Sequence, residues 1–353
     1  MSISRNPLWR YLLLGGLSLI LPAPAQACAT CGCSLSSDAA LGYSTSSGWR
    51  VNLEYDYIDQ SQLRSGASPI SAAQVAHINN AGGNQEVEHQ TVNRYANLGI
   101  SYNPNAAWNI STLIPYIDRS HTTYGSAAID QLTADNISGV NSSGLGDIKF
   151  IVSYQGLLPR NNLGLQLGIK LPTGNYGGQN MNTGATVGRN PAFFSSGPYA
   201  GTTGTALDTS LQDGTGSTDL LAGAYYYQPV SQNFDAFINS QFQAAIAENL
   251  DQTGANYRPG NLATVSVGLR YEASPEWTPQ LQINITHKSH DQGALADTTD
   301  TAGTVAYLSP GISVNLPNNM QIYAFVQLPV YSELQGYQLF PLWTGSAGAS
   351  YAF

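Results

Sequence analysis

The strict alternation of apolar and polar residues over Gly144–Gly174 limits the fold of this chain more than any other feature of its sequence. The apolar positions of the two halves are Ile148, Phe150, Val152 and Tyr154, then Leu163, Leu165, Leu167, Ile169 and Leu171. A period of two residues is the period of a β-strand, and the break at residues 157–162 predicts a hairpin turn. A soluble β-sandwich shows the same alternation, so the hairpin leaves open what covers the apolar rows.

The composition of the 353-residue chain favours a membrane barrel. Only 10% of the residues are charged, against roughly a quarter in ordinary soluble domains. The mean hydropathy of −0.15 is too low for a helical membrane protein, but it suits a β-barrel, in which a water-facing residue accompanies each lipid-facing one. The net charge of −9 argues against binding of nucleic acid through a basic face.

The N-terminus predicts export from the cytoplasm. Arg5 and Arg10 precede the apolar run Tyr11–Leu21, and Ala25-Gln-Ala27 is a small-x-small cleavage site. The apolar run is too short to cross a bilayer as a helix, which needs about 20 residues. We therefore expect three parts, which are a signal peptide over 1–27, a cysteine-containing periplasmic segment over 28–47, and an outer-membrane barrel over 48–353.

Three cysteines, Cys28, Cys31 and Cys33, are the only cysteines of the chain. Thiols this close together cannot join distant parts of a fold. Three interpretations stay open: a local disulfide with a spare thiol, a site for a thiophilic metal ion, and lipidation of Cys28. Ala25 stands where a lipidation signal usually has Leu. We expect no other cofactor.

Twelve segments of the mature chain show strand alternation. They are Gly48–Asp59, Gln90–Asn103, Ala107–Ser120, Gly144–Gln155, Leu163–Pro172, Thr215–Gln228, Asn233–Ile246, Asn261–Ala273, Trp277–Ser289, Gly303–Leu316, Met320–Pro329 and Phe340–Phe353. The connections alternate between short turns, such as Pro317–Asn319, and long loops, such as Thr173–Gly214, as periplasmic turns and extracellular loops do. The sequence therefore predicts an all-β, antiparallel up-and-down transmembrane barrel of about twelve strands in the bacterial outer membrane.

Several short motifs support this fold by resemblance. They are Gly144-Leu-Gly-Asp-Ile148, Leu171-Pro-Thr-Gly174, Thr215–Asp219, Tyr257–Gly260, Tyr307–Gly311, Pro329–Tyr331 and Gly336–Gln338. As a set, they resemble the outer-membrane barrel family named for the meta-pathway of phenol degradation. The resemblance covers most of the mature chain and implies a barrel that passes small, aromatic or apolar molecules, with no catalytic residues. The cysteine segment lies outside that family pattern.

Parity assigns the residues that face the interior. If Phe353 and the apolar rows face lipid, the opposite rows carry sixteen lumen-lining candidates. They are Arg50, Asn52, Glu54, Asp56, Lys149, Lys170, Asp219, Tyr225, Tyr227, Asp235, Phe237, Arg270, Glu272, Lys288, Tyr323 and Phe325. Arg or Lys on a lipid-facing row near mid-membrane would cost about 2–4 kcal/mol, so this segregation of charge favours a barrel. The inward aromatic residues either form a constriction or fill space.

Two functions are compatible with this pattern. The first is a channel or transporter for small, aromatic or apolar solutes, with outer-membrane lipid and the solute as partners. The alternative is a barrel associated with metal binding or electron transfer through Cys28, Cys31 and Cys33, with a periplasmic partner at the N-terminus. We expect no enzymatic activity. His287 and Ser289 share the lipid-facing parity of one strand, but a third polar group to orient them is not evident on the next strand.

Overall fold

The computed structural model describes residues 47–201 and 205–353 of the chain. Its strands are β1 (Gly48–Gly66), β2 (Ser68–Pro69), β3 (Glu88–Asn105), β4 (Trp108–Thr123), β5 (Ser138–Leu145), β6 (Lys149–Tyr154), β7 (Leu163–Lys170), β8 (Tyr176–Gln179), β9 (Thr186–Arg189), β10 (Ser217–Pro229), β11 (Phe234–Glu248), β12 (Leu262–Tyr271), β13 (Trp277–Lys288), β14 (Gly303–Leu316) and β15 (Met320–Ala352). Its helices are α2 (Ala72–Asn80) and the 3-10 turns η1 (Ile129–Gln131), η2 (Ala134–Asn136) and η3 (Thr209–Leu211). Within these two ranges, no helix is long and apolar enough to cross a membrane.

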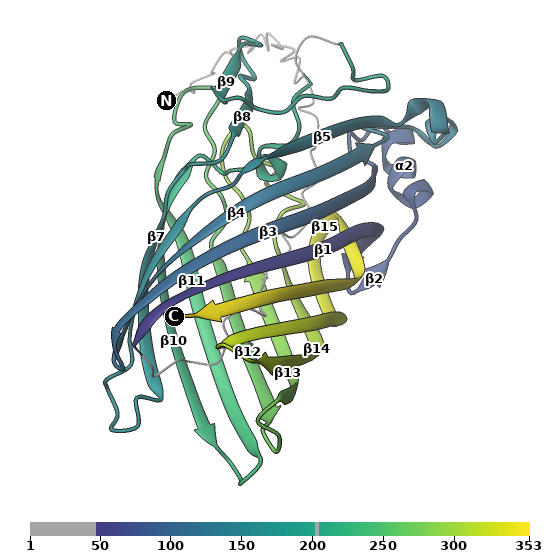
Figure 1. Cartoon of the computed structure of the whole chain (residues 1–353). Coiled ribbons are helices and arrows are strands. Elements are labelled where there is room, and N and C mark those ends of the chain that lie inside the picture. The colour runs from purple at the N-terminus through teal and green to yellow at the C-terminus, as the bar shows by residue number, and fades with distance from the viewer. Residues whose placement is uncertain (1–46, 202–204) are drawn as a thin grey trace, which may run out of the picture.

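The strands close into an antiparallel ring in chain order. Neighbours in the sequence pair with each other from β1 and β3 round to β14 and β15, and β15 pairs with β1 from Arg50↔Ala352 to Gly66↔Leu334. Figure 1 shows these strands running obliquely round the ring. The predicted all-β transmembrane barrel is confirmed. Closure of β15 on β1 pairs both edges of the ring, as a bilayer requires.

The last named strand accounts for two of the crossings. β15 is 33 residues long; its first part pairs with β14 and its last part with β1. It folds back near Gly336, which has a positive φ of 63°, so that the Ala352 amide donates to the Asn319 carbonyl at 3.1 Å. We call each passage of the chain along the barrel wall a crossing. The ring strands other than β15 make ten crossings when β5 and β6 are counted as one. The two crossings of β15 bring the total to the predicted twelve.

The fourth crossing differs from its prediction. The sequence predicted one continuous strand over Gly144–Gln155, but β4 pairs with β5 down to Tyr116↔Leu145 and then with β6 from Leu113↔Lys149. Residues 146–148 lie between the two ladders. A side chain at Gly146 would come within 3.0 Å of Pro115 and Ile117, and Asp147 is buried. At the break, the buried Asp147 side chain forms an ion pair with Lys170.

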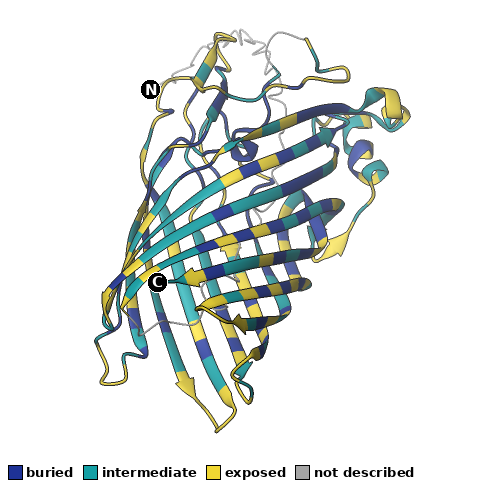
Figure 2. Ribbon diagram, in the orientation of Figure 1, coloured by how far each residue is buried: buried dark blue, intermediate teal, exposed yellow. Residues whose placement is uncertain are grey.

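Polarity is inverted relative to a soluble protein. The exposed rows are apolar, and Leu165 and Leu167 are 51% and 61% exposed, while the buried rows are polar, and Gln282 and Asn284 are 0% exposed. Figure 2 shows this as alternating exposed and buried bands along each strand. Alternation of this kind is the signature of a barrel with lipid outside and polar groups inside.

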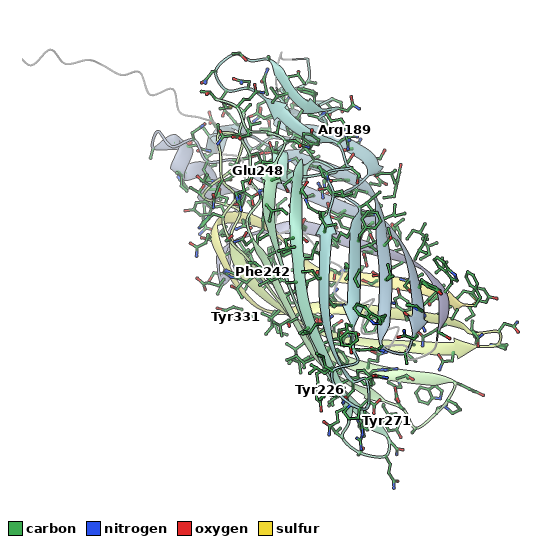
Figure 3. All side chains as sticks on the ribbon, turned by 90° about the vertical axis from the view of Figure 1, so that its left-hand side faces the viewer. Arg189, Tyr226, Phe242, Glu248, Tyr271 and Tyr331 are labelled. Atoms are coloured by element: carbon green, nitrogen blue, oxygen red, sulfur yellow. The ribbon has the colours of Figure 1, made fainter. Side chains whose placement is uncertain are left out.

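The ring has a turn end and a loop end. The turn end carries the five short connections and both Gly48 and the C-terminus, where Trp49 and Phe353 exchange backbone hydrogen bonds of 2.8 and 2.9 Å. Three cross-strand aromatic pairs lie there, with ring centroids 4.7, 4.7 and 5.0 Å apart: Trp49 with Tyr102, Trp108 with Tyr154, and Phe234 with Tyr271. Figure 3 shows Tyr226 and Tyr271 at this end and Phe242 at mid-height. Such pairs are typical of an interfacial aromatic girdle.

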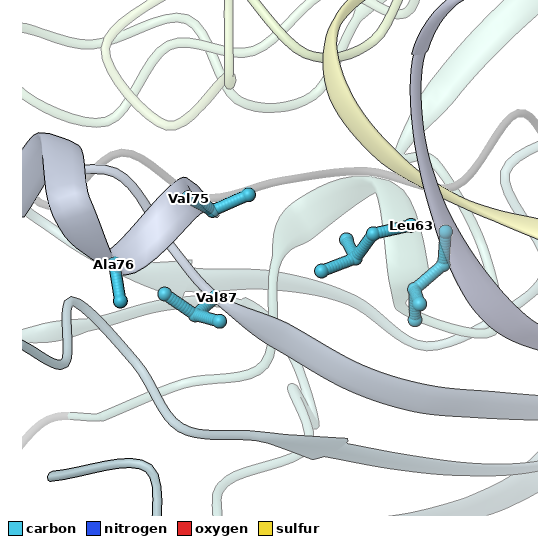
Figure 4. Close-up of a cluster of buried hydrophobic side chains, with 5 residues drawn as sticks. Leu63, Val75, Ala76 and Val87 are labelled. Carbon is cyan, nitrogen blue, oxygen red and sulfur yellow. The ribbon is translucent and has the colours of Figure 1, made fainter. Parts of the chain in front are cut away.

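A small separate core stabilises the loop end outside the ring. α2 begins at Ser71, whose hydroxyl caps the Gln74 amide in a capping box, and buries Val75 and Ala76. These side chains pack with Leu63, Val87 and Leu339 (Figure 4). The sequence predicted only a loop between the first two crossings, because nine helical residues with two buried side chains give a weak periodic signal.

Candidate functional site: the interior of the barrel

The sixteen residues predicted to face the interior differ in how far their side chains are buried. Ten are buried, namely Asn52, Glu54, Asp56, Lys170, Asp219, Tyr225, Phe237, Lys288, Tyr323 and Phe325. Arg50, Lys149, Tyr227, Asp235 and Arg270 are half-buried, and Glu272 is exposed near the turn end. The buried members come from strands all round the ring, so the sequence pattern brings together side chains far apart in the chain.

The acidic residues of the first strand are held by neutral donors. The Tyr323 hydroxyl donates to Glu54 Oε2 at 2.8 Å and lies 3.1 Å from Asn52 Oδ1. Asn97 Nδ2 donates to Asp56 Oδ2 at 2.8 Å. Hydrogen bonds to buried carboxylates partly replace the water that they lose on burial. This wall of the interior is therefore acidic and closely hydrogen-bonded.

A buried ion cluster, which we call the Lys170 cluster, lies at the break between β5 and β6. Lys170 Nζ is 2.8 Å from Asp147 Oδ2 and 3.2 Å from Asp219 Oδ2, and all three side chains are at most 7% exposed. Lys170 also donates to Ser217 at 3.2 Å and to Thr215. The backbone amide of Thr215 donates to Asp147 at 3.0 Å. The cluster thus joins the break to the start of β10, and its pairing compensates part of the cost of burying charge.

The inward aromatic residues lie over glycines of neighbouring strands. Phe237 faces Gly268 across β11 and β12, and Phe325 faces Gly311 across β15 and β14. A Cβ atom at Gly268 would be 2.5 Å from Phe237 Cζ, and one at Gly311 would be 2.1 Å from Phe325 Cδ1.

Tyr225 over Gly164 and Tyr323 over Gly348 repeat this arrangement, with closest distances of 2.1 and 2.4 Å. Aromatic rings that cover strand glycines protect exposed backbone and fix register. The four rings therefore lie along the wall. Each ring packs against a glycine of a neighbouring crossing, and a role as a constriction stays a prediction.

A loop segment packs against the inner row of β4 at the loop end. Residues 207–213, including η3, are all buried. Arg119 on β4 donates to the carbonyls of Leu211 and Gln212 and to the Tyr95 hydroxyl at 3.0 Å. Leu207 and Leu211 pack with Phe194. The sequence pattern does not show this position of the Thr173–Gly214 loop, because its contacts with Arg119 join residues about 90 positions apart.

Buried carboxyl groups lie on the loops that meet this segment. Burial raises the pKa of Asp208 well above its ordinary value; two hydrogen bonds from Ser210 oppose the shift, and Asp297 and Asp291 add to it. Burial and then Asp297 raise the pKa of Asp300 to about 7. Burial also raises the pKa of Asp297. The packed loops therefore favour the protonated carboxyl groups.

The comparisons with known proteins agree with this geometry. A family model described as "MetA-pathway of phenol degradation" matches residues 72–340. The chain belongs to this family. The comparison with curated proteins finds no matching sequence.

Several solved structures are similar to this phenol-degradation family barrel in different degrees. An outer membrane channel from Pseudomonas putida F1 is 11% identical, with a TM-score of 0.58, and the match covers 88% of this chain and 97% of that one. The β domain of the Bordetella autotransporter BrkA is 11% identical over 87% of this chain and all of that one, with a TM-score of 0.48. The toluene transporter TbuX of Ralstonia pickettii is 10% identical over 87% and 90%, with a TM-score of 0.42. The first of these matches shows the same β-barrel fold.

The turn end of this family member contains a cavity. Its volume is about 580 Å³, and its lining includes Arg50, Asn103, Gln321 and Ser350 together with the C-terminal Phe353. Arg50 and Ser350 belong to the inward rows of β1 and β15. The cavity therefore borders the inward rows of β1 and β15 at the turn end.

Two sets of sequence candidates lie elsewhere. Cys28, Cys31 and Cys33 are outside the described residues, and their metal-binding role stays a prediction. His287 hydrogen-bonds through Nδ1 to Thr304 on β14 at 2.8 Å, and the Ser289 hydroxyl accepts from the Asn261 amide at 2.8 Å. His287 and Ser289 are therefore bonded to different partners. Thr304 is a polar residue on the next strand that was not among the expected partners of His287.

Proposed function

We propose that this protein is an outer-membrane channel through which small aromatic or apolar solutes pass by passive or facilitated diffusion. One observation supports it above all. The closed ring has apolar side chains on its exposed rows and buried polar side chains on its inner rows. This inversion suits a protein that is surrounded by lipid and encloses a polar path.

The width of the path follows from the number of strands. Eight strands leave room for side chains or one small ligand, and about 16–18 leave an open aqueous channel. A ring of twelve crossings lies between these limits, and its inner side chains are closely packed. The path is therefore narrow, and the segment 207–213 controls its loop end.

Conductance in planar bilayers tests this function. The refolded full chain should give small, discrete current steps. Arg119→Met should raise the conductance, because the inner loop segment loses hydrogen bonds to the wall. Arg94→Met is the matched control, since Arg94 makes a partly exposed ion pair with Asp118 at 3.6 Å. If neither the wild type nor Arg119→Met conducts any current, the proposed channel function is wrong.

The alternative function through Cys28, Cys31 and Cys33 concerns residues outside the described part of the chain. It stays a prediction with a direct test. The mass of the mature N-terminus, measured with and without reductant and chelator, distinguishes a disulfide, a bound metal ion and a lipid. Replacement of Cys31 and Cys33 by Ser should leave the conductance of a channel unchanged.

A further inference from the structure

A group of uncharged side chains on β13 and β14 stands out within the ring. We call it the amide patch; it consists of Gln280, Gln282 and Asn284 on β13 and Ser309 on β14. These residues are at most 4% exposed. Gln282 and Ser309 lie directly opposite each other in the ladder.

The amide patch contains an unusual number of unpaired polar atoms. Five have no hydrogen-bond partner in the described structure: both polar atoms of Gln282, Gln280 Oε1, Asn284 Oδ1 and Ser309 Oγ. They make up more than a third of the fourteen such side-chain atoms in the described residues. Buried polar groups are normally paired, and an unpaired one is unfavourable. The patch is therefore suited to a partner that both donates and accepts hydrogen bonds.

Two aromatic rings flank the amide patch. Gln282 is in register with Gly268, which lies under Phe237, and Gln280 is in register with Gly311, which lies under Phe325. Because Gly268 is on β12 and Gly311 is on β14, two residues further along the ladder, the two rings are roughly 12 Å apart. This spacing suits a solute with one aromatic ring and a polar substituent.

Paired charges border the patch at both of its ends. Arg270, in register with Gln280, forms an ion pair of 2.9 Å with Glu272. Toward the loop end, Lys288 forms an ion pair of 2.9 Å with Asp291. The four patch residues carry no charge, so the patch offers hydrogen bonds without a charge to attract or neutralise an ion.

We infer that the amide patch is the solute-binding site of the channel and that it selects neutral one-ring aromatic solutes bearing a hydroxyl, carbonyl or amide group. Hydrocarbons of the same size leave the amides unpaired, and aromatic anions bring a charge that nothing in the patch compensates. The side chains of Gln and Asn rotate aside to admit the solute, and the new hydrogen bonds offset their displacement. This inference rests on the proposed channel function.

Blockade of the ion current tests the inference in the full chain. The probes are benzyl alcohol, toluene and benzoate, which differ in hydrogen bonding and charge around one aromatic ring. Benzyl alcohol should block the wild type at a concentration about fivefold lower than toluene, the effect expected of roughly one net hydrogen bond. Benzoate should block least. Gln282→Leu should bring benzyl alcohol and toluene to nearly equal blockade.

Two further variants control this experiment. Ser346→Ala changes a buried residue of β15 outside the patch and should keep the wild-type preference. Gln280→Leu repeats the test at a second patch position if Gln282→Leu does not fold, and resistance to unfolding in SDS reports folding. Equal blockade by benzyl alcohol and toluene in the wild type, or an unchanged preference in the folded patch variants, would overturn the inference but not the proposed channel function. If the protein conducts no current at all, both the channel function and the binding site are wrong.

Discussion

At the scale of single residues, the pairing of glycine with an aromatic ring is the feature that sequence parity could not supply. Parity placed Phe325 and Tyr323 on inward rows, and both are buried there. It could not show that their rings lie on Gly311 and Gly348, because each glycine belongs to another crossing. Parity therefore predicted which way the aromatic residues face. The glycine that each ring covers depends on the pairing register of its strand with the neighbouring one.

Gly311→Ala tests this packing. The added methyl group would lie 2.1 Å from the ring of Phe325, so the ring must move. We expect a loss of about 1–3 kcal/mol in the free energy of unfolding, as for overpacked cores. Gly99→Ala is the matched control, because its nearest neighbour, Asn52 Cβ, would be 3.6 Å away. Urea denaturation in detergent measures both, and equal effects would argue against a role for the ring contact.

The Lys170 cluster makes a second prediction at this scale. Lys170→Met leaves the buried carboxylates of Asp147 and Asp219 without their cation. Removal of one partner from a buried ion pair typically costs about 3–5 kcal/mol. Urea denaturation should show a loss of this size. The triple variant Lys170→Met, Asp147→Asn, Asp219→Asn should recover much of it, and no recovery would mean that the cluster acts through packing alone.

At the scale of elements, most predicted strands are reproduced, but the fourth is divided into β5 and β6, and the structure of the loops was not predicted. Each crossing was visible because alternation is a local property of ten or so residues. The break at residues 146–148, the helix α2 and the inward segment 207–213 were not visible. They depend on partners such as Thr215, Val87 and Arg119 in other parts of the chain.

The packed loops should open as the pH rises. Asp300 has a pKa of about 7 in the folded loops against an ordinary value of 3.8. Between these values the closed loops bind more protons than the open ones, so closure is strongest below about pH 4 and weakens up to about pH 7. Hydrogen exchange of residues 205–213 and 295–302, corrected for intrinsic rates, should be slower at pH 5 than at pH 8.

Two variants check the origin of this pH dependence. Asp300→Asn should flatten it, because the amide does not titrate. Asp130→Asn, at an exposed position in a different loop, should leave it intact. A dependence that persists in Asp300→Asn would place its origin in another group, such as Asp208 or Asp297.

At the scale of the whole molecule, composition and alternation together predicted the barrel, its twelve crossings and its membrane. The low charge content and the polar inner rows exclude an ordinary soluble core. When every crossing pairs with its neighbours in the sequence, β15 closes on β1. The amide patch was beyond prediction, since Gln280, Gln282 and Asn284 read only as the polar half of a strand. The unpaired atoms of this patch appear only when β12 and β14 are in place; Gln280 Nε2 still donates to Ser313, and Asn284 Nδ2 to Gln327.

The alternation of lipid contact along one strand is the most direct test of the central claim. In a chain with Cys28, Cys31 and Cys33 replaced by Ser, a fluorophore is attached at Leu165→Cys, Gln166→Cys or Leu167→Cys of β7. Quenching by nitroxide groups on lipid tails is then measured in proteoliposomes. The account predicts strong, weak and strong quenching in that order, because Leu165 and Leu167 are exposed outside the ring and Gln166 is not. Equal quenching at the three positions, or the reverse order, would contradict it.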